Sequence, residues 1–276
     1  MWHTGIIAGM ALLVLTPSFA ATRPRIASMN VCTDQLLLSL ADPGQIAGLS
    51  RYVKEEWQSW RASQAQNSPV LSGGAEDILM LKPDVVVASL FDKRSTRELL
   101  RRNGVPLVEF PVPQTMGEVR EQVRAIGEVT GHADRAKAEI ARLDAAVLRA
   151  RHALANRTER VLPLSRRGWV AGRNSLIGAL LHEAGLRNAA DELAFTDGGF
   201  VSLEAIIALK PDLLLVSEEG DTAEDEGRAF VLHPALERFY PLDKRIVIPA
   251  RLTVCGGEML AVALDLLVEA MQQVRH

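Results

Sequence analysis

The stretch Leu81-Lys82-Pro83-Asp84-Val85-Val86-Val87-Ala88-Ser89 has a second copy 128 residues later, Leu209-Lys210-Pro211-Asp212-Leu213-Leu214-Leu215-Val216-Ser217. The apolar run in each copy is continuous rather than alternating, which is typical of a parallel strand buried on both faces. We expect a short helix before each run, over Glu76–Leu81 and Leu203–Leu209, because the proline that follows ends it. Two copies are too few for a solenoid, so the repeat predicts two homologous lobes.

Strand-like and helix-like segments also alternate outside the repeat. In the first half, the expected segments are strands at Arg25–Met29, Ile46–Leu49 and Pro106–Glu109, with helices at Thr33–Leu40 and Arg94–Arg102. In the second half, strands are expected at Arg160–Leu164, Trp169–Ala171 and Arg245–Ile248. This alternation favours parallel sheets with helices on both faces. The predicted fold class is therefore α/β, with two doubly wound lobes.

A long helical stretch separates the two halves. Thr115 and Glu118 form a capping-box start, and the first apolar stripe ends at Gly131. A second stripe, from Ala136 to Leu154, recurs at steps of three and four. A helix of about twenty residues is about 30 Å long, the width of a small domain. We therefore predict a rigid connecting strut over residues 115–156, between lobes at 21–114 and 157–276.

The amino-terminal segment has the pattern of an export signal. The first twenty residues contain no Asp, Glu, Lys or Arg. Gly5–Leu15 is an apolar run too short to cross a bilayer, and Ser18-Phe19-Ala20 is a small-x-small triplet that a signal peptidase accepts. We expect residues 1–20 to be a cleavable signal peptide and the mature chain to reside in the periplasm. The alternative is an N-terminal membrane anchor.

Composition and motifs narrow the function. The 276-residue chain has 24% charged residues and a formal net charge of −3, so it lacks the basic excess of a nucleic-acid-binding protein. It contains no phosphate loop, GxSxG elbow, HExxH or GxGxxG motif after a strand. We find no compact set of His and carboxylate ligands for a metal. An enzyme on a doubly wound scaffold, or a receptor that senses a ligand without transport, is the alternative interpretation.

The chain has two cysteines, Cys32 and Cys255. In an oxidising compartment such a pair favours a disulfide. A bond closing so long a loop would stabilise the fold by roughly 5 kcal/mol in the chain-entropy model. Two free buried thiols, or soft ligation to a metal centre, are the alternatives.

Several motifs, taken in order, carry a family resemblance: Ala27–Asp34, the two Leu-Lys-Pro-Asp copies, Trp169–Ala190 and Arg251–Gly257. Their order and spacing resemble the periplasmic binding proteins for vitamin B12 and iron–siderophore complexes, which serve ABC importers. That family has two α/β lobes joined by a single long helix, the class III architecture. The chain departs from the pattern at Thr253, where many members carry Trp, and at Glu258, where they often carry Pro.

The resemblance implies capture rather than catalysis. The chain would bind a metal chelate (cobalamin, a ferric siderophore or a haem-like compound) and deliver it, as a monomer without a cofactor of its own, to a permease and ATPase in the inner membrane. Glu76 and Glu204 match family glutamates on the two lobe tips that pair with importer arginines. The alternative is structural, because a first-turn carboxylate favours its helix by roughly 0.3–1 kcal/mol.

The candidate ligand contacts are aromatic side chains near predicted strand ends or turns, together with one arginine. Aromatic residues make up only 5% of the chain, and ligands of open α/β sheets bind beyond the carboxyl ends of strands. Rings there could line a pocket for a corrin, haem or siderophore, and an arginine could pair with a ligand carboxylate or phosphate. The candidates are Tyr52, Trp57, Phe91, Trp169, Phe200 and Arg251. Core or rim packing, or a solvated arginine, is the alternative for each.

Overall fold

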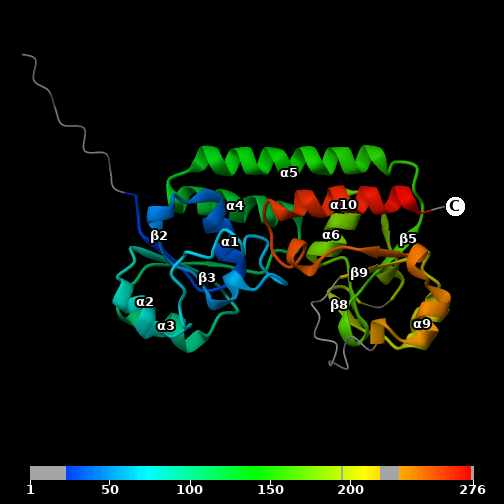
Figure 1. Cartoon of the computed structure of the whole chain (residues 1–276), viewed down its shortest axis with the longest axis horizontal. Coiled ribbons are helices and arrows are strands. Elements are labelled where there is room, and N and C mark those ends of the chain that lie inside the picture. Colours follow the sequence, from blue (N-terminus) through cyan, green and yellow to red (C-terminus); the bar gives the residue numbers. More distant parts are fainter. Residues whose placement is uncertain (1–22, 194, 218–229, 275–276) are drawn as a thin grey trace, which may run out of the picture.

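Two α/β lobes lie side by side beneath a layer of long helices (Figure 1). This computed structural model describes residues 23–193, 195–217 and 230–274. The predicted signal peptide, residues 1–20, lies outside the described residues. Within the described ranges, no helix combines the length and the apolar character that crossing a bilayer requires.

The first lobe, here the N-lobe, is built on a parallel sheet of four strands in the order β2-β1-β3-β4. The strands are β1 (Ile26–Ser28), β2 (Ile46–Gly48), β3 (Val85–Ser89) and β4 (Leu107–Phe110). The helices are α1 (Val31–Leu40), α2 (Ala75–Leu81) and α3 (Arg94–Arg102), with short 3-10 helices η1 (Pro43–Gln45) and η2 (Arg51–Lys54). The helices expected before and after the first repeat copy are thus present.

The second lobe, here the C-lobe, has a six-stranded mixed sheet in the order β10-β9-β5-β6-β8, with β7 paired to β5. The strands are β5 (Arg160–Leu164), β6 (Trp169–Ala171), β7 (Arg187–Asn188), β8 (Gly198–Phe200), β9 (Leu213–Val216) and β10 (Arg245–Val247). The helices are α6 (Leu176–Glu183), α7 (Leu203–Leu209), α9 (Pro234–Phe239) and α10 (Met259–Gln273).

A wholly parallel sheet is a wrong expectation for one edge of the C-lobe. Strand β6 runs antiparallel to β5, and β8 runs antiparallel to β6. The 3-10 turn η3 (Arg166–Gly168) reverses the chain directly after β5, where a parallel pair would need a crossover of a dozen or more residues. Strand β8, which begins with Gly198-Gly199 just ahead of α7, was not among the expected strands.

The Leu-Lys-Pro-Asp unit has the same backbone in both copies. Lys82 (φ 46°, ψ 57°) and Lys210 (φ 50°, ψ 54°) adopt the left-handed conformation and end α2 and α7. The aspartate then fixes the neighbouring strand, because Arg25 N donates to Asp84 Oδ2 over 2.7 Å. In the second copy, Arg160 N donates to Asp212 Oδ2, also over 2.7 Å. The motif therefore ends a helix and joins two parallel strands within four residues.

The connector consists of two helices, α4 (Met116–Thr130) and α5 (Ala133–Ala153), which pack on each other. Gly131, with φ 70°, takes the left-handed position that ends α4. The 21 residues of α5 lie over both lobes and also pack on α10 of the C-lobe (Figure 1). Helix α5 is therefore the single long helix that joins the lobes.

One apolar core, to which the long helices contribute, contains residues of both lobes. It contains Leu37 of α1, Val119 of α4, Leu143 of α5 and Leu264 of α10, none more than 1% exposed. Each such side chain stabilises the fold by about 1.5–3 kcal/mol on burial. Because this core is shared, the lobes are packed together at their helical ends.

A disulfide joins Cys32, at the start of α1, to Cys255, in the loop before α10. It is the favoured of the three interpretations of the cysteine pair, and neither cysteine is free. An ion pair between Arg61 of the N-lobe and Glu258 lies three residues beyond Cys255. The loop before α10 is therefore held to the N-lobe by one covalent and one ionic contact.

Candidate functional site

A hollow of about 220 Å³ lies at the carboxyl edge of the N-lobe sheet. Its walls come from the segments that follow β1, β2 and β3, together with the start of α2: Ser28, Met29, Ser50, Arg51, Tyr52, Leu71, Ser72, Gly73, Ile78, Phe91, Asp92 and Lys93. This N-lobe hollow therefore occupies the position where open α/β sheets bind ligands.

The polar rim of the N-lobe hollow is formed by η2. Ser50 caps this short helix, because its hydroxyl accepts a hydrogen bond from Tyr52 N at 3.3 Å. The Arg51 guanidinium lies 4.7 Å from the centre of the Tyr52 ring, and its Nη2 donates to Tyr52 Oη over 2.5 Å. The phenol ring is thus held by a cation–π contact and a hydrogen bond while 40% of Tyr52 stays exposed.

Another part of the rim is formed by the loop after β3. Asp92 Oδ2 accepts hydrogen bonds from Asn30 Nδ2 at 2.9 Å and from Ser89 N at 2.7 Å. These bonds fix the loop, and Phe91 at its tip is 80% exposed. An aromatic side chain that is so exposed contributes little to the apolar core. On a fixed loop it is well placed to contact a ligand.

A fully buried carboxyl group lies beneath the N-lobe hollow. Asp34 of α1 is 0% exposed and accepts hydrogen bonds from Ser50 N (3.0 Å) and Ser50 Oγ (2.5 Å). Burial raises the pKa of Asp34 to about 7, although hydrogen bonds from Ser28 and Ser50 lower it. The negative charge of Asp92 raises it further.

A second hollow, of about 210 Å³, lies at the carboxyl edge of the C-lobe sheet. Residues at or after the ends of β5, β9 and β10 contribute most of its lining, with α6 and the loop before α10: Pro163, Leu164, Ser165, Ala171, Ile177, Leu215, Ser217, Ile248, Ala250, Thr253 and Val254. None of these lining side chains is charged. This C-lobe hollow therefore differs from the N-lobe hollow, whose lining includes Arg51, Asp92 and Lys93.

Each hollow has a lining residue close in sequence to one cysteine of the disulfide. Met29 of the N-lobe hollow is three residues from Cys32, and Val254 of the C-lobe hollow precedes Cys255. Cys32 Sγ lies 3.8 Å from the carbonyl oxygen of Val254. We refer to the two hollows together as the interlobe cleft.

The structure brings two of the predicted ligand contacts, Tyr52 and Phe91, to the same N-lobe hollow. Trp169 and Phe200 lie on the paired strands β6 and β8 and pack edge to face, with ring centres 5.0 Å apart at 73°. Neither lines the C-lobe hollow, although Phe200 is 65% exposed. A direct contact of these rings with ligand stays a prediction.

Trp57 and Arg251 lie elsewhere. Trp57 is 53% exposed and lines neither hollow of the cleft. Arg251 lines a separate hollow together with Glu56 and Trp60 of the N-lobe. Their predicted role as ligand contacts has no support from this placement.

Sequence reasoning did not identify most of the lining. Ser50, Arg51 and Lys93 lie directly after strands, as Phe91 does, so the same strand-end rule would have found them. Thr253 and Val254 belong to the motif Arg251–Gly257, in which we selected only the arginine. The choice of aromatic residues alone was therefore too narrow.

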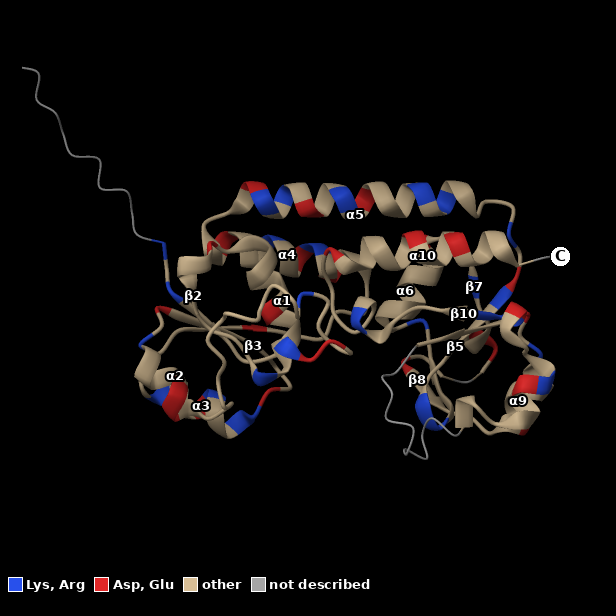
Figure 2. Cartoon of the chain, in the orientation of Figure 1, with Lys and Arg blue, Asp and Glu red and all other residues tan. Residues whose placement is uncertain are grey.

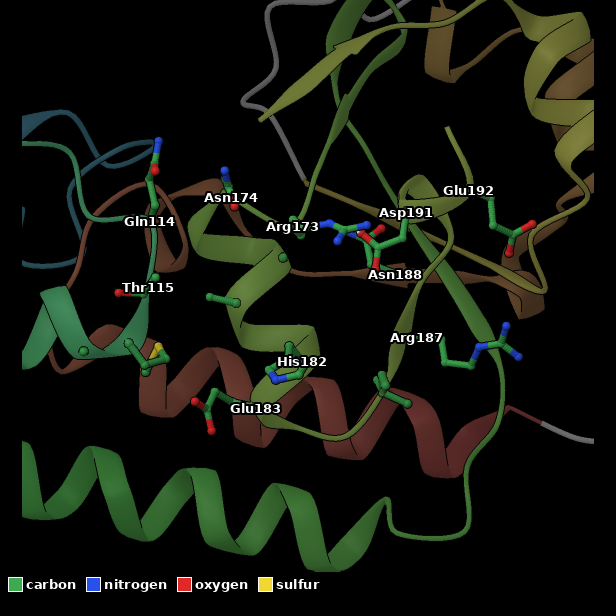
Figure 3. A pocket seen from close by; sticks show the side chains of 15 residues that line it. Gln114, Thr115, Arg173, Asn174, His182, Glu183, Arg187, Asn188, Asp191 and Glu192 are labelled. Carbon is green, nitrogen blue, oxygen red and sulfur yellow. Dashed lines mark ion pairs between the residues drawn. The ribbon is translucent and has the colours of Figure 1, made fainter. Parts of the chain in front are cut away.

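A larger hollow, of about 700 Å³, lies between the amino end of α4 and the C-lobe elements α6, β7 and η4 (Ala189–Glu192) (Figure 3). Three of its carboxylates have arginine partners: Asp191 with Arg173 (3.4 Å), Glu183 with Arg151 (2.9 Å), and Glu192 with Arg160 (2.7 Å). These three carboxylates therefore already form ion pairs within the protein.

We place the candidate site in the interlobe cleft instead, because exposed aromatic side chains lie there at the ends of the strands.

The two repeat glutamates are exposed in the first turns of α2 and α7. Hydrogen bonds from its own backbone and from Ser202 lower the pKa of Glu204. The Glu76 carboxylate lies close to Gly74, the residue before α2: a Cβ built on Gly74 would be 2.8 Å from Glu76 Oε2. The acidic turn of α2 is at the end of the N-lobe away from the helix layer (Figure 2). Both side chains favour their helices and remain accessible.

Among the residues that the structure describes, no group of three or more His, Cys, Asp or Glu side chains is arranged to hold a metal ion. Two α/β lobes joined by a long helix, with a hollow at each facing sheet edge, define a two-lobed solute-binding protein. The family model "Periplasmic binding protein" matches residues 26–241, and the chain belongs to this family of binding proteins rather than enzymes.

Individual relatives agree with this assignment. The chain is 26% identical over 224 residues to the cobalamin-binding protein of two strains of Halobacterium salinarum. That match covers 78% of this chain and 59% of the length of those relatives.

Solved structures show the same fold. The periplasmic heme-binding protein RhuT of Roseiflexus sp. RS-1, in apo form, superposes with a TM-score of 0.74 at 22% identity, over 92% of this chain and 100% of that one. The periplasmic vitamin B12 binding protein BtuF of Vibrio cholerae gives a TM-score of 0.67 at 16% identity, over 90% and 97%.

Proposed function

We propose that the chain captures a metal chelate (a corrinoid, a haem or a ferric siderophore) in the interlobe cleft and delivers it to an ABC importer. The observation that carries the proposal is the pair of hollows at the facing sheet edges, one of them rimmed by Tyr52 and Phe91. The relatives named for cobalamin and heme support the ligand class.

The rings at the cleft suit a broad, flat ligand. Phe91 is 80% exposed, and burying an aromatic ring removes about 150–250 Å² of surface from water. The fixed loop after β3 adds little ordering cost on binding, because Asp92 already holds it. A chelate seated against these rings would gain affinity mainly from apolar contact.

The test is to titrate the chain lacking residues 1–20 with cyanocobalamin, haemin and several ferric siderophores, following tryptophan quenching. We expect one class to bind at micromolar concentration or below, and Phe91→Ala to weaken that binding about tenfold. Leu242→Ala is the matched control, because Leu242 is 84% exposed and lies on η5 (Leu242–Lys244), which does not line the cleft. Absence of binding by every chelate would refute the proposal.

We further propose that Glu76 and Glu204 pair with arginines of the importer. Both carboxylates are exposed, and they occupy equivalent positions in the two lobes. The double exchange Glu76→Arg and Glu204→Arg should leave chelate binding intact and abolish association with the purified permease–ATPase complex. Glu269→Arg, on the exposed side of α10, is the control that should retain association. Normal association of the double variant with the complex would leave only the favourable effect of each carboxylate on its own helix.

We propose that residues 1–20 are cleaved after Ala20 and that the mature chain resides in the periplasm. We also propose that the mature chain is a monomer. Residues 1–20 carry the pattern of a signal peptide, and the family of the chain is that of periplasmic binding proteins. Protein purified from a periplasmic fraction should begin at Ala21 by N-terminal sequencing and behave as a monomer in light scattering. Protein retained in the membrane with Met1 intact would indicate an anchor instead.

A further inference from the structure

The buried carboxyl group of Asp34 is connected to the rim of the cleft by an unbroken set of hydrogen bonds. Ser50 donates to it twice, from N to Oδ1 and from Oγ to Oδ2. The same Ser50 hydroxyl accepts from Tyr52 N at 3.3 Å. The Ser50 hydroxyl therefore links the side chain of Asp34, which is 0% exposed, to the backbone N–H of Tyr52, whose ring lies at the candidate site.

Burying the Asp34 carboxyl group costs the fold free energy, so its position beneath the N-lobe hollow suggests a role there. A carboxyl group removed from water is disfavoured in its charged form unless hydrogen bonds replace the lost hydration. An apolar residue at this place in α1 would avoid that cost. Both residues that supply hydroxyls to Asp34, Ser28 and Ser50, line the N-lobe hollow.

We propose that Asp34 is a positioning residue for ligand binding: its ionised carboxylate holds Ser50, and through Ser50 it fixes η2 and the ring of Tyr52 at the N-lobe hollow. The proposal rests on the proposed function of the cleft. Protonation of Asp34 turns one of its oxygens into a donor, so Ser50 can no longer donate to both oxygens as it does here. Tyr52 is then less firmly placed, and ligand affinity falls with decreasing pH.

The charged groups nearest Asp34 lie on the loop after β3 and on η2. Asp92, on the loop after β3, acts on it electrostatically, and burial with this charge raises the pKa of Asp34 to about 7. On η2, Arg51 donates to Tyr52 Oη and Lys54 donates to the Gln66 carbonyl. Strand β1 contributes only Ser28, and α4 packs on α1 through apolar side chains.

Two basic side chains, Arg51 and Lys93, also line the N-lobe hollow. The described histidines are on α5, at the start of α5, on α6 and before α9, and none lines the N-lobe hollow.

The first test needs no ligand. The chain has two tyrosines, so protein labelled with ¹³C in the tyrosine rings gives separate signals for Tyr52 and the buried Tyr240. We expect the Tyr52 signal of the wild type to move with a midpoint near pH 7, and the Tyr240 signal to stay fixed. Asp34→Asn, which keeps the size of the side chain and cannot ionise, should abolish the movement.

Glu139→Gln is the matched control. Glu139 is another buried carboxyl group that accepts from a serine, Ser39, but it lies on α5, away from the cleft. The Tyr52 titration should persist in this variant. A Tyr52 signal that does not move in the wild type, or that moves equally in Asp34→Asn, overturns the proposal.

The second test measures affinity for cyanocobalamin and haemin between pH 5.5 and 8.5. If only the ionised form is competent, the wild type should bind about tenfold more weakly at pH 6 than at pH 8. Asp34→Asn should show a flat profile, apart from any titration of haemin itself. Ser50→Ala should bind weakly at every pH, because it removes the link and leaves Asp34 in place.

The two tests separate failure of this inference from failure of the proposed function. If the Tyr52 titration occurs as expected but neither probe nor any ferric siderophore binds, the cleft function is wrong while the link from Asp34 to Tyr52 stands. If a probe binds and the affinity of Asp34→Asn varies with pH as in the wild type, the positioning role is wrong while capture stands.

Discussion

The two sheet edges that face the cleft have equivalent origins and different chemistry. In both lobes a Leu-Lys-Pro-Asp unit sets the central strand, with a left-handed lysine and an aspartate that accepts from the neighbouring strand over 2.7 Å. The N-lobe edge adds serines, Arg51 and Lys93 over a buried carboxyl group. The C-lobe edge presents no charged lining side chain. A repeated backbone motif can therefore support one charged and one uncharged half of the same site.

The surroundings of the two repeat units also differ. Helix α7 begins at Ser202, whose hydroxyl accepts from Ala205 N at 3.2 Å, whereas α2 begins at Gly74 without a side-chain cap. Arg160 forms two contacts with Glu192, at 2.7 and 2.9 Å, in addition to its bonds to the repeat. The second copy is thus more strongly supported by side chains, while the backbone of the motif itself is unchanged.

The largest expected effect comes from breaking the covalent link between the two edges. The variant with Cys32→Ser and Cys255→Ser should lose roughly 5 kcal/mol of unfolding free energy, because the bond closes a loop of more than two hundred residues in the unfolded chain. Urea unfolding measures the loss, and the wild type under reducing conditions should reproduce it. A difference below about 1 kcal/mol would mean that the shared apolar core alone holds the lobes together.

The next effect concerns the buried charge that distinguishes the N-lobe edge. Folding raises the pKa of Asp34 from 3.8 to about 7, so the folded state favours the protonated form. Stability from this group is therefore present below pH 4 and is lost as pH rises towards 7. Relative to Asp34→Asn, the wild type should lose roughly 4 kcal/mol between pH 4 and pH 8.

Paired denaturation curves of the two proteins across this range test the prediction. The comparison cancels the contributions of the other carboxylates to the pH dependence of stability. Several of these have lowered pKa values, as Asp42 does beside Arg135 and His132, and so stabilise the fold as pH rises. A constant difference between the two proteins would show that Asp34 does not change its protonation on folding.

The smallest effect concerns what the two repeat units share. Lys82 and Lys210 both hold a left-handed backbone that costs a non-glycine residue about 1 kcal/mol. Lys82→Gly and Lys210→Gly should each stabilise the protein by up to about 1 kcal/mol, offset in part by the greater freedom of glycine in the unfolded chain. Thermal unfolding of both single variants tests the symmetry of the motif. A gain in one lobe only would show that the units differ in strain as well as in their surroundings.

The parts of the fold that could be predicted from the sequence are those that depend on nearby residues. The expected helix Arg94–Arg102 and strand Arg160–Leu164 have those bounds in the structure, because apolar periodicity and proline act locally. Strand β8 was not predicted, because its three residues form a strand only by pairing with β6, which no local sequence pattern indicates.

The candidate site was predictable only in part for the same reason. Phe91 could be found by its place after a strand, whereas the role of Asp34 depends on Ser50, sixteen residues away, folding over it. Arg251 shares its motif with residues of the C-lobe hollow, yet it lines a hollow with Glu56 and Trp60 because the loop before α10 is held to the N-lobe.

The bond between Cys32 and Cys255 has a topological consequence. It makes residues 32–255, which include both sheets except β1 and all helices except α10, a closed covalent ring. A single cut by a protease anywhere in that ring opens it but releases no fragment, so both lobes stay attached until the disulfide is reduced. A nicked molecule should therefore run as one species on a non-reducing gel and as two on a reducing one, and it can keep both halves of its cleft together.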